Sequence, residues 1–367
     1  MADESQRKKT LPQWLLPTPA RRDERAGPPL REFTLRLMRG EDLKREEAAS
    51  LLDALLDGTA TDAQIGAALV ALAVKGETVE ELAGLASSMR GRAVRIRARH
   101  ERFVDTAGTG SSAAKTFNVS TAAAFVIAGA GLPVAKHGSR AATSRSGSAD
   151  VLTALGVNVS APPEVSEVCL NELGVCFMFA PLYHGATARV AGVRRELGVH
   201  TTFNLLGPLT NPAGAPRQVI GVWHEALVEP LAHTLRALGS ERAWVVHGLD
   251  GLDEVTLDGR TKVAEVTEGG VRVFEVAPED FGLEASSLEP LRGGDAEANA
   301  AIIRSILSSE RRDAGRALVL LNAAAALYVG GAAEDLRGGA RLAAESIDGG
   351  AALAKLEELV RASKAEG

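Results

Sequence analysis

The 367-residue sequence has few cysteines, few aromatic residues and no excess of positive charge, and each shortage excludes a class of protein. Its only cysteines, Cys169 and Cys176, are too few for a disulfide framework and are not spaced like a metal-binding motif. The formal net charge of −6 at pH 7 gives no general attraction for nucleic acid or anionic lipid. We therefore expect no nucleic-acid partner, and any bound anion requires a local basic site.

Long apolar runs are missing as well. No uninterrupted apolar stretch is long enough to span a bilayer, so no membrane association is expected. Residues 1–30 mix charges with five prolines and lack both the apolar core and the cleavage site of a signal peptide. We expect a mobile N-terminal arm over these residues and a cytoplasmic protein.

Aromatic residues make up only 4% of the sequence while glycine is abundant, which favours closely packed helices and glycine loops over a β-sandwich. Apolar residues recur on one face of 43–56, and Thr61 can cap a helix that continues to Gly76. Thr78 opens another helix, with acidic residues in its first turn. These signals predict a small helical domain over 31–99.

Near residue 103 the helical pattern gives way to short apolar runs that alternate with helical stretches. This alternation predicts a larger α/β domain over 100–367 with a central, mainly parallel sheet. A helix containing Arg189, within about 186–204, either remains with this domain or joins the helical domain. The expected strands end near Asp105 or cover 133–136, 175–180, 218–223, 243–247, the surroundings of Val255, 261–266 and 271–276.

A glycine-rich segment, 105–121, lies between a predicted strand and a predicted helix. Gly108 and Gly110 let the backbone approach an anion closely, and Asn118, Ser120 and Thr121 lie where the helix begins. The simpler interpretation is a glycine turn with a capping hydroxyl. The number of hydroxyls and amides favours a phosphate site, although the dinucleotide pattern G-x-G-x-x-G is absent.

Two further segments carry charge at strand ends. Lys136, His137 and Arg140 occur in a hydroxyl-rich loop that is suited to the charged oxygens of a phosphorylated sugar, although a solvated basic turn is the simpler interpretation. Asp253 and Glu254 form an acidic pair that suggests Mg²⁺ held by few protein ligands, although acidic turns are common on surfaces.

These segments, together with the 203–212 run Phe-Asn-Leu-Leu-Gly-Pro-Leu-Thr-Asn-Pro, resemble the anthranilate phosphoribosyltransferase family of tryptophan biosynthesis. The resemblance extends from about residue 33 to the C-terminus. It implies a helical domain with a larger α/β domain of the nucleoside phosphorylase/phosphoribosyltransferase type, and a homodimer formed through the helical part. It also implies transfer of a phosphoribosyl group from phosphoribosyl pyrophosphate (PRPP) to the amino group of anthranilate, with Mg²⁺.

The resemblance assigns binding roles but no acid or base. For PRPP it implies Gly108, Gly110, Ser111, Ser112, Thr116, Asn118, Ser120, Thr121, Lys136 and Ser148. For anthranilate it implies Gly108, His137, Ser139, His184, Arg194 and Pro208. For Mg²⁺ it implies Ser120, Asp253 and Glu254.

The sequence departs from the family pattern at three places. Ser111-Ser112 replace the usual Gly-Asp after the first glycines, which removes a carboxylate that would help to arrange the diphosphate and metal. Ser139 replaces an asparagine, and Gly185 replaces a proline. Because Arg194 and the acidic pair remain, we interpret these differences as variation within the enzyme family.

Two other functions are alternatives. A pyrimidine nucleoside phosphorylase has a similar architecture, but the Asp253-Glu254 pair and the 203–212 segment favour the transferase. A non-catalytic relative could bind nucleic acid through 136–145, but the negative net charge and the presence of Arg194 oppose this.

Overall fold

The computed structural model describes residues 30–110, 114, 116–141 and 146–364. Within this part, the chain divides into two compact units, which are described separately below. One is helical and contains the described residues up to Arg92 together with Ala186–Leu206. The other contains Ala93–Gly185 and the described residues from Gly207 onward. Among all described residues, no helix has the length and apolar character needed to cross a membrane.

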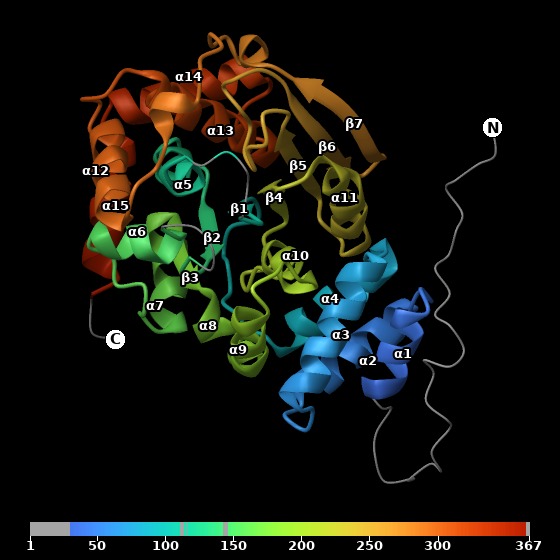
Figure 1. Ribbon diagram of the computed structural model, residues 1–367. Coiled ribbons are helices and arrows are strands. Elements are labelled where there is room, and N and C mark those ends of the chain that lie inside the picture. Colours follow the sequence, from blue (N-terminus) through green and yellow to red (C-terminus); the bar gives the residue numbers. More distant parts are fainter. Residues whose placement is uncertain (1–29, 111–113, 115, 142–145, 365–367) are drawn as a thin grey trace, which may run out of the picture. The chain divides into compact units, whose positions relative to one another are not determined.

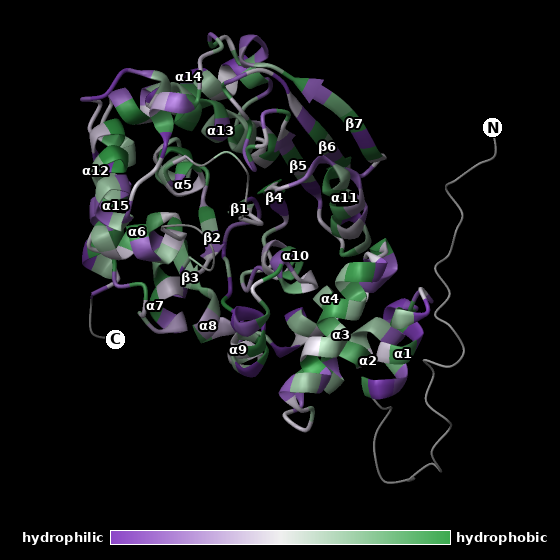
Figure 2. Cartoon of the chain, in the orientation of Figure 1, coloured by the Kyte–Doolittle hydropathy of each residue, from purple (hydrophilic) through white to green (hydrophobic). Residues whose placement is uncertain are grey.

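The helical unit contains the following elements: α1 (Leu30–Met38), α2 (Arg45–Leu56), α3 (Asp62–Lys75), α4 (Val79–Arg92), α9 (Ala188–Leu197) and the start of α10 (Thr202–Leu209). The predicted cap is confirmed: Gln64 N–H donates to Thr61 Oγ1 at 3.2 Å, and Thr61 N–H donates to Gln64 Oε1 at 2.8 Å. Gly76, with φ 81°, ends α3 as expected. Hydrophilic and hydrophobic stretches alternate along α1 and α2 (Figure 2), as expected for helices that bury one face.

Helices α2 and α4 approach closely at Gly84. A Cβ added there would lie 2.1 Å from the carbonyl oxygen of Arg45, so the Gly84→Ala variant must separate the two helices. We expect it to lower the free energy of unfolding by about 1–3 kcal/mol, the range for overpacking. Gly91 lies in the same helix with open space around its Cβ position, so Gly91→Ala should stabilise by up to about 1 kcal/mol. Urea denaturation followed by circular dichroism measures both; equal effects would contradict the close approach.

The α/β unit is built on a sheet that is seven-stranded within the described residues, with the order β3-β2-β1-β4-β5-β6-β7. The strands are β1 (Val104–Gly108), β2 (Val134–Gly138), β3 (Val175–Phe179), β4 (Arg217–Gly221), β5 (Arg242–Gly248), β6 (Thr261–Thr267) and β7 (Gly270–Val276). Strands β1 to β5 run parallel, while β6 and β7 are antiparallel. The predicted fold class, a small helical domain and a larger α/β domain with a mainly parallel sheet, is confirmed.

Helices surround this sheet (Figure 1). α5, α13, α14 and α15 pack against one another, and α11 packs against β5, β6 and β7. The helices are α5 (Val119–Gly129), α6 (Ser148–Ala154), α7 (Pro163–Val168), α8 (Ala180–Tyr183), α11 (Val228–Ala237), α12 (Ala296–Leu307), α13 (Ala314–Gly330), α14 (Leu336–Asp348) and α15 (Ala351–Ala362). Short helical turns occupy Cys169–Leu173, Gly185–Thr187, Glu225–Leu227, Pro278–Phe281 and Glu289–Leu291.

The prediction of a strand around Val255 is wrong. The backbone of Val255 is paired with a side chain instead of a neighbouring strand: its N–H donates to Asn322 Oδ1, and its carbonyl accepts from Asn322 Nδ2, both at 2.9 Å. The segment is therefore a loop, held by α13 directly after the acidic pair.

The strand order places a topological switch point at β1. The chain continues from β1 to β2 and β3 on one side, and then returns to pair β4 with the other side of β1. In open parallel sheets, ligands bind at the carboxyl ends of the strands at such a point. Gly108 and Gly221, the last residues of β1 and β4, are paired there.

Candidate active site

The glycine-rich loop begins at the carboxyl end of β1 and is tied to β4. Thr109 N–H donates to the carbonyl of Gly221 at 2.9 Å, and Trp223 N–H donates to Thr109 Oγ1 at 3.1 Å. Gly108 and Gly110 are exposed, and Gly110 adopts a φ of 67° that favours glycine. The loop thus exposes backbone without side chains at the switch point. The predicted ligands Ser111 and Ser112 lie outside the described residues.

The loop leads into the N-terminus of α5, where Asn118, Ser120 and Thr121 lie. The Asn118 side chain is held between two other segments: Asn299 Nδ2 donates to its Oδ1 at 3.1 Å, and its Nδ2 donates to the carbonyl of Ser146 at 3.2 Å. Asn299, on α12, was not found by sequence reasoning. No local signal could have found it, because it is a lone asparagine far along the chain from its partner.

Lys136, on β2, reaches the same place from the neighbouring strand. Its Nζ donates to the carbonyl of Thr106 at 2.5 Å and to Ser120 Oγ at 3.3 Å. Burial lowers the pKa of this ammonium, while the carboxyl groups of Asp105 and Glu254 act in the opposite direction. The structure therefore brings together two predicted PRPP residues, Ser120 and Lys136, from different strand ends.

The acidic pair lies against these elements. Glu254 Oε1 accepts the N–H of Ser120 at 3.3 Å. An added Cβ on Gly108 would lie 3.1 Å from Asp253 Oδ2, and one on Gly221 would lie 1.6 Å from the carbonyl oxygen of Asp253. Any side chain at 221 would displace the backbone of Asp253, whereas one at 108 would require a small shift of the Asp253 side chain.

Burial, and then the charge of Asp253, raise the pKa of the Glu254 carboxyl. A bound cation would favour the ionised form of this buried carboxyl group beside a second carboxylate. Among the described residues, no cluster of three or more histidine, cysteine or acidic side chains could hold a metal by itself. The residues thus fit a Mg²⁺ ion that has few protein ligands and takes its remaining oxygens from a substrate.

Two predicted anthranilate residues, His137 and His184, are buried side by side. Their ring centroids lie 5.1 Å apart, and His137 Nδ1 is 3.2 Å from the carbonyl oxygen of Gly207. The following Pro208 is fixed through its carbonyl, which accepts from Gln218 Nε2 at 3.0 Å. The structure therefore brings His137, His184 and Pro208 into one region of the α/β unit.

Asp105 and Asn211, at the two ends of segments that the sequence singled out, hold this region together. Asn211 Nδ2 donates to Asp105 Oδ2 at 2.7 Å and to the carbonyl of Ala135 at 2.8 Å. The N–H of His137 donates to Asp105 Oδ1 at 3.2 Å. Neither Asp105 nor Asn211 was predicted as a site residue, and both support its geometry.

His137 makes stability depend on pH. Burial first, and His184 second, lower its pKa from 6.5 to about 3. Because the folded state holds the neutral ring, the contribution of His137 is complete above pH 6.5 and is lost as the pH falls toward 3. Asp105, whose pKa burial raises to about 6, acts in the opposite direction, since its contribution is lost as the pH rises through 6.

Comparison of wild type with His137→Gln separates the histidine from Asp105. Below pH 6, the difference in free energy of unfolding should shrink by about 1.4 kcal/mol per pH unit, the value for one proton. Urea denaturation at pH 7, 6 and 5, followed by fluorescence of buried Trp244, measures it. His233→Gln, at a half-exposed ring, is the control and should leave the pH dependence unchanged. Parallel curves for wild type and His137→Gln would contradict the assignment.

The basic loop after β2 is less cationic than its sequence suggests. Arg140 donates to Asp150 Oδ1 at 2.8 Å, and Asp150 Oδ2 also accepts the N–H groups of Ala141 and Gly147, each at 2.9 Å. Ser148 Oγ donates to the carbonyl of exposed Ser139 at 3.3 Å. Arg140 is thus neutralised locally, and Lys136 is the cation directed at α5. Residues 142–145 of this loop lie outside the described residues.

Arg194 belongs to the helical unit, on α9. Its Nη2 donates to Asn204 Oδ1 at 3.1 Å, and its guanidinium lies 5.5 Å from the ring centroid of Phe203. Burial lowers its pKa, its buried Nε has no hydrogen-bond partner, and no carboxylate forms an ion pair with it among the described residues. Neighbouring Arg195 is exposed, as predicted for a surface charge. A half-buried arginine without a carboxylate partner is suited to a ligand carboxylate.

Comparisons with known proteins agree with this arrangement. Residues 31–93 match the helical bundle domain of a glycosyl transferase family, and residues 100–353 match its α/β domain. An anthranilate phosphoribosyltransferase from Anaeromyxobacter dehalogenans is 55% identical over 331 residues, which cover 89% of this chain and 97% of the relative.

Solved structures give the same result. A crystal structure of anthranilate phosphoribosyltransferase from Thermus thermophilus has a TM-score of 0.86 and 43% identity, covering 91% of this chain and 99% of that one. The enzyme from Saccharomyces cerevisiae in complex with PRPP and Mg has a TM-score of 0.83 and 28% identity, covering 91% and 97%. This chain therefore belongs to the anthranilate phosphoribosyltransferase family.

Proposed function

We propose that this chain transfers the phosphoribosyl group of PRPP to the amino group of anthranilate, producing N-(5-phosphoribosyl)anthranilate and diphosphate in tryptophan biosynthesis. The observation that carries the proposal is the meeting of Ser120, Lys136 and Glu254 at the switch point of the parallel sheet. Backbone amides, a buried cation and an acidic pair in one place are suited to a diphosphate with a divalent metal.

For PRPP we propose the residues of the glycine-rich loop and the start of α5, with Lys136 and Ser148. The exposed Gly108 and Gly110 let phosphate oxygens approach the backbone of the loop, and the positive end of the α5 dipole lies beside it. Lys136 adds positive charge without filling the space above the loop, because its ammonium is bound to Thr106 and Ser120. The full set is Gly108, Gly110, Ser111, Ser112, Thr116, Asn118, Ser120, Thr121, Lys136 and Ser148.

Ser120, Asp253 and Glu254 are the proposed holders of Mg²⁺, because the raised pKa of Glu254 reflects a carboxyl pair that a cation would stabilise. The S. cerevisiae relative solved with PRPP and Mg supports this choice of metal. When bound, the ion would stabilise negative charge on the departing diphosphate. The residues of the chain orient the diphosphate oxygens and hold the leaving group beside the start of α5.

Anthranilate is the proposed acceptor, bound by Gly108, His137, Ser139, His184, Arg194 and Pro208. An arylamine is uncharged near neutral pH, so the attack needs no strong base, and we assign none. Arg194 would pair with the carboxylate of anthranilate, as its lack of a carboxylate partner among the described residues suggests. His137 would stay neutral, because its pKa is lowered to about 3, and would orient the ring without competing for that carboxylate.

An assay with anthranilate, PRPP and Mg²⁺ tests the proposal. The fluorescence of anthranilate should fall only when the purified protein and all three components are present. Chelation of the metal should abolish the change. Release of a base from pyrimidine nucleosides in phosphate buffer, without any use of anthranilate, would support the phosphorylase alternative. Binding of DNA that weakens with salt, again without turnover, would support the non-catalytic alternative.

We also propose a homodimer formed through the helical unit. Helices α1 and α3 pack together and expose Met38, Val70 and Val74, whose exposed fractions are 43%, 40% and 83%. Exposed apolar side chains on a pair of packed helices are candidates for a subunit interface. Light scattering after gel filtration should give twice the chain mass, and Val74→Glu should shift it toward the monomer. Val199→Glu, at an apolar residue 57% exposed elsewhere in the unit, is the control; a monomeric wild type would refute the proposal.

We also propose the domain organisation and the cytoplasmic location that were expected from the sequence. The domains would be 31–99, joined by about 186–204, and 100–367, following the N-terminal arm 1–30. The residues matched by the two family domains, 31–93 and 100–353, support this division. The free thiols of Cys169 and Cys176 are consistent with the reducing cytoplasm.

A further inference from the structure

The turn that begins α10 is closed by reciprocal hydrogen bonds. The N–H of Thr201 donates to Asn204 Oδ1 at 3.1 Å, and the N–H of Asn204 donates to the carbonyl of Thr201 at 2.8 Å. The first bond is one half of a capping box and holds the Asn204 side chain, while the second closes the backbone turn at the start of the helix. The amide oxygen of Asn204 therefore has a defined position.

Arg194 depends on this turn. Its Nη2 donates to the same Asn204 Oδ1 at 3.1 Å, and its guanidinium lies over the ring of Phe203. One turn thus supplies both a hydrogen-bond acceptor and an aromatic surface to the arginine. A displacement of the turn would change the direction in which the guanidinium points, without removing any atom from the arginine.

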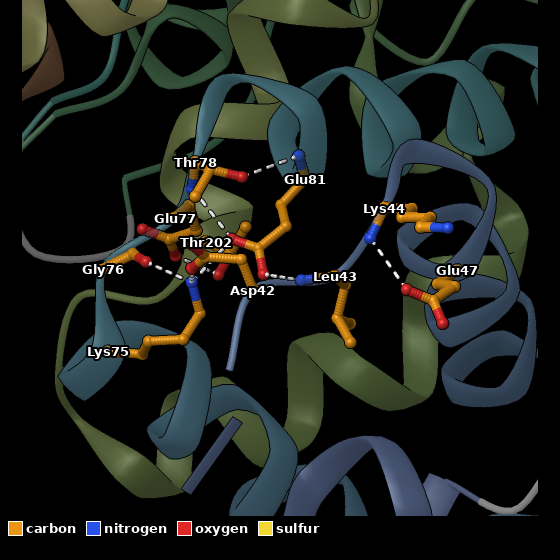
Figure 3. Close-up of polar contacts among 10 residues, drawn as sticks. All are labelled: Asp42, Leu43, Lys44, Glu47, Lys75, Gly76, Glu77, Thr78, Glu81 and Thr202. Atoms are coloured by element: carbon orange, nitrogen blue, oxygen red, sulfur yellow. Dashed lines mark hydrogen bonds and ion pairs between the residues drawn. The ribbon is translucent and has the colours of Figure 1, made fainter. Parts of the chain in front are cut away.

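Glu77 holds this turn from the other side. The hydroxyl of Thr202, which lies between Thr201 and Phe203, donates a short hydrogen bond to Glu77 Oε1. Thr202 is almost completely buried, and Glu77 is half-buried. A hydrogen bond from a hydroxyl to a carboxylate is of the stronger, charge-assisted kind. Figure 3 shows Glu77 and Thr202 beside one another, at the connection between α3 and α4.

The connection that carries Glu77 is itself rigid. Lys75 Nζ donates to Glu81 Oε2, to Asp42 Oδ1 and to the carbonyl of Gly76, each at 2.8 Å (Figure 3). Glu81 Oε2 also accepts the N–H of Thr78 at 2.8 Å. In the Lys75–Glu81 pair the side chains are 5% and 0% exposed, so this ion pair is well shielded from water. Glu77 is therefore presented from a fixed point.

We propose that Glu77 is a positioning residue that sets acceptor binding by fixing, through Thr202, the turn on which Arg194 rests. The inference rests on the proposed function, because it requires Arg194 to bind the carboxylate of anthranilate. Nothing in this chain of contacts involves the residues proposed for PRPP. Loss of the Glu77–Thr202 hydrogen bond should therefore affect one substrate and not the other.

Steady-state kinetics of the full-length protein test the inference, with anthranilate and PRPP varied in turn. Glu77→Ala should raise KM for anthranilate about 10-fold or more and leave KM for PRPP within about twofold. Thr202→Val removes the hydroxyl at nearly constant volume and should have the same effect, whereas Thr202→Ser should behave like wild type. Glu80→Gln, an exposed carboxylate in the next helix, is the matched control and should change neither constant.

A double-mutant comparison of Glu77 and Thr202 is the most decisive measurement. Glu77→Ala combined with Thr202→Val should be no worse than either single variant, because both remove the same hydrogen bond. An equal rise in both KM values, or an additive double variant, would overturn the inference and leave a general effect on folding. If Glu77→Ala does not fold, the Thr202→Val and Thr202→Ser pair decides.

Arg194→Ala, measured in parallel, distinguishes failure of the proposed role of Glu77 from failure of the proposed anthranilate site. If Arg194→Ala raises KM for anthranilate selectively but Thr202→Val does not, the role of Glu77 is wrong and the proposed site stands. If Arg194→Ala has no selective effect, the anthranilate assignment fails and the inference fails with it.

Discussion

Replacing Arg194 with alanine should raise KM for anthranilate about 100-fold, which corresponds to the roughly 3 kcal/mol lost when a buried charge pair is broken. KM for PRPP should stay within about twofold, because Arg194 lies on α9 and none of the proposed PRPP residues belongs to that helix. The reason is physical: Arg194 is half-buried, its buried Nε has no hydrogen-bond partner, and burial alone lowers its pKa. Anthranilate offers the missing carboxylate.

Arg195 provides the matched control for this prediction. It follows Arg194 on the same helix, carries the same charge and is exposed. Arg195→Ala should leave both KM values unchanged, so any effect of Arg194→Ala is not a consequence of net charge or helix propensity. Benzoate, a carboxylate without the amine, should inhibit wild type and lose its inhibition in Arg194→Ala. An equal rise of both KM values in Arg194→Ala would instead show that α9 supports the whole protein.

Replacing Glu254 with glutamine should lower kcat/KM by about 100- to 1,000-fold, the range for loss of one group that stabilises developing charge. Glutamine keeps the shape of glutamate and can still accept the Ser120 N–H, so the fold should be retained. What disappears is one of two adjacent carboxylates, and with it half of the negative charge that the metal would meet. Calorimetry should show that PRPP binds tightly to wild type only when Mg²⁺ is present, and weakly to Glu254→Gln.

Two further measurements serve as controls for this prediction. Glu268→Gln removes the same charge at an exposed position in the turn between β6 and β7 and should leave kcat/KM unchanged. Removing Mg²⁺ with a chelator should bring wild type and Glu254→Gln to a similar low rate. Full activity of Glu254→Gln at saturating Mg²⁺ would exclude Glu254 as a metal ligand.

Local signals in the sequence predicted local structure well. The cap at Thr61 and the end of α3 at Gly76 depend on residues within one turn, so they could be found from spacing alone. The alternation of apolar runs likewise predicted the mainly parallel sheet. The same reasoning failed at Val255, whose apolar character resembles a strand. Its backbone groups are bound by the side chain of Asn322, 67 residues further along, and no local pattern contains that information.

The candidate site shows the same contrast between local signals and contacts that join residues far apart in the sequence. The resemblance grouped Ser120 with Lys136 for PRPP and with Glu254 for Mg²⁺, and the structure shows the hydrogen bonds by which Lys136 and Glu254 meet Ser120. Asn299, which orients Asn118 from 181 residues away, was missed because one asparagine in a helix carries no signal. Glu77 was missed for a similar reason, since its partner Thr202 is 125 residues away. The residues proposed to bind a ligand were recognisable as motifs, whereas the residues that hold those motifs in place were not.

The division of the chain into units also bears on its synthesis. Ala186–Leu206 completes the helical unit but is inserted between two parts of the α/β unit, and β4, the partner of β1, follows it. Neither unit can close while residues beyond Gly185 are still inside the ribosome. The first helices and β1 to β3 must therefore wait, with apolar surface uncovered, until more than half of the polypeptide has emerged. We therefore expect a pause in translation just before Ala186 to prolong this exposure.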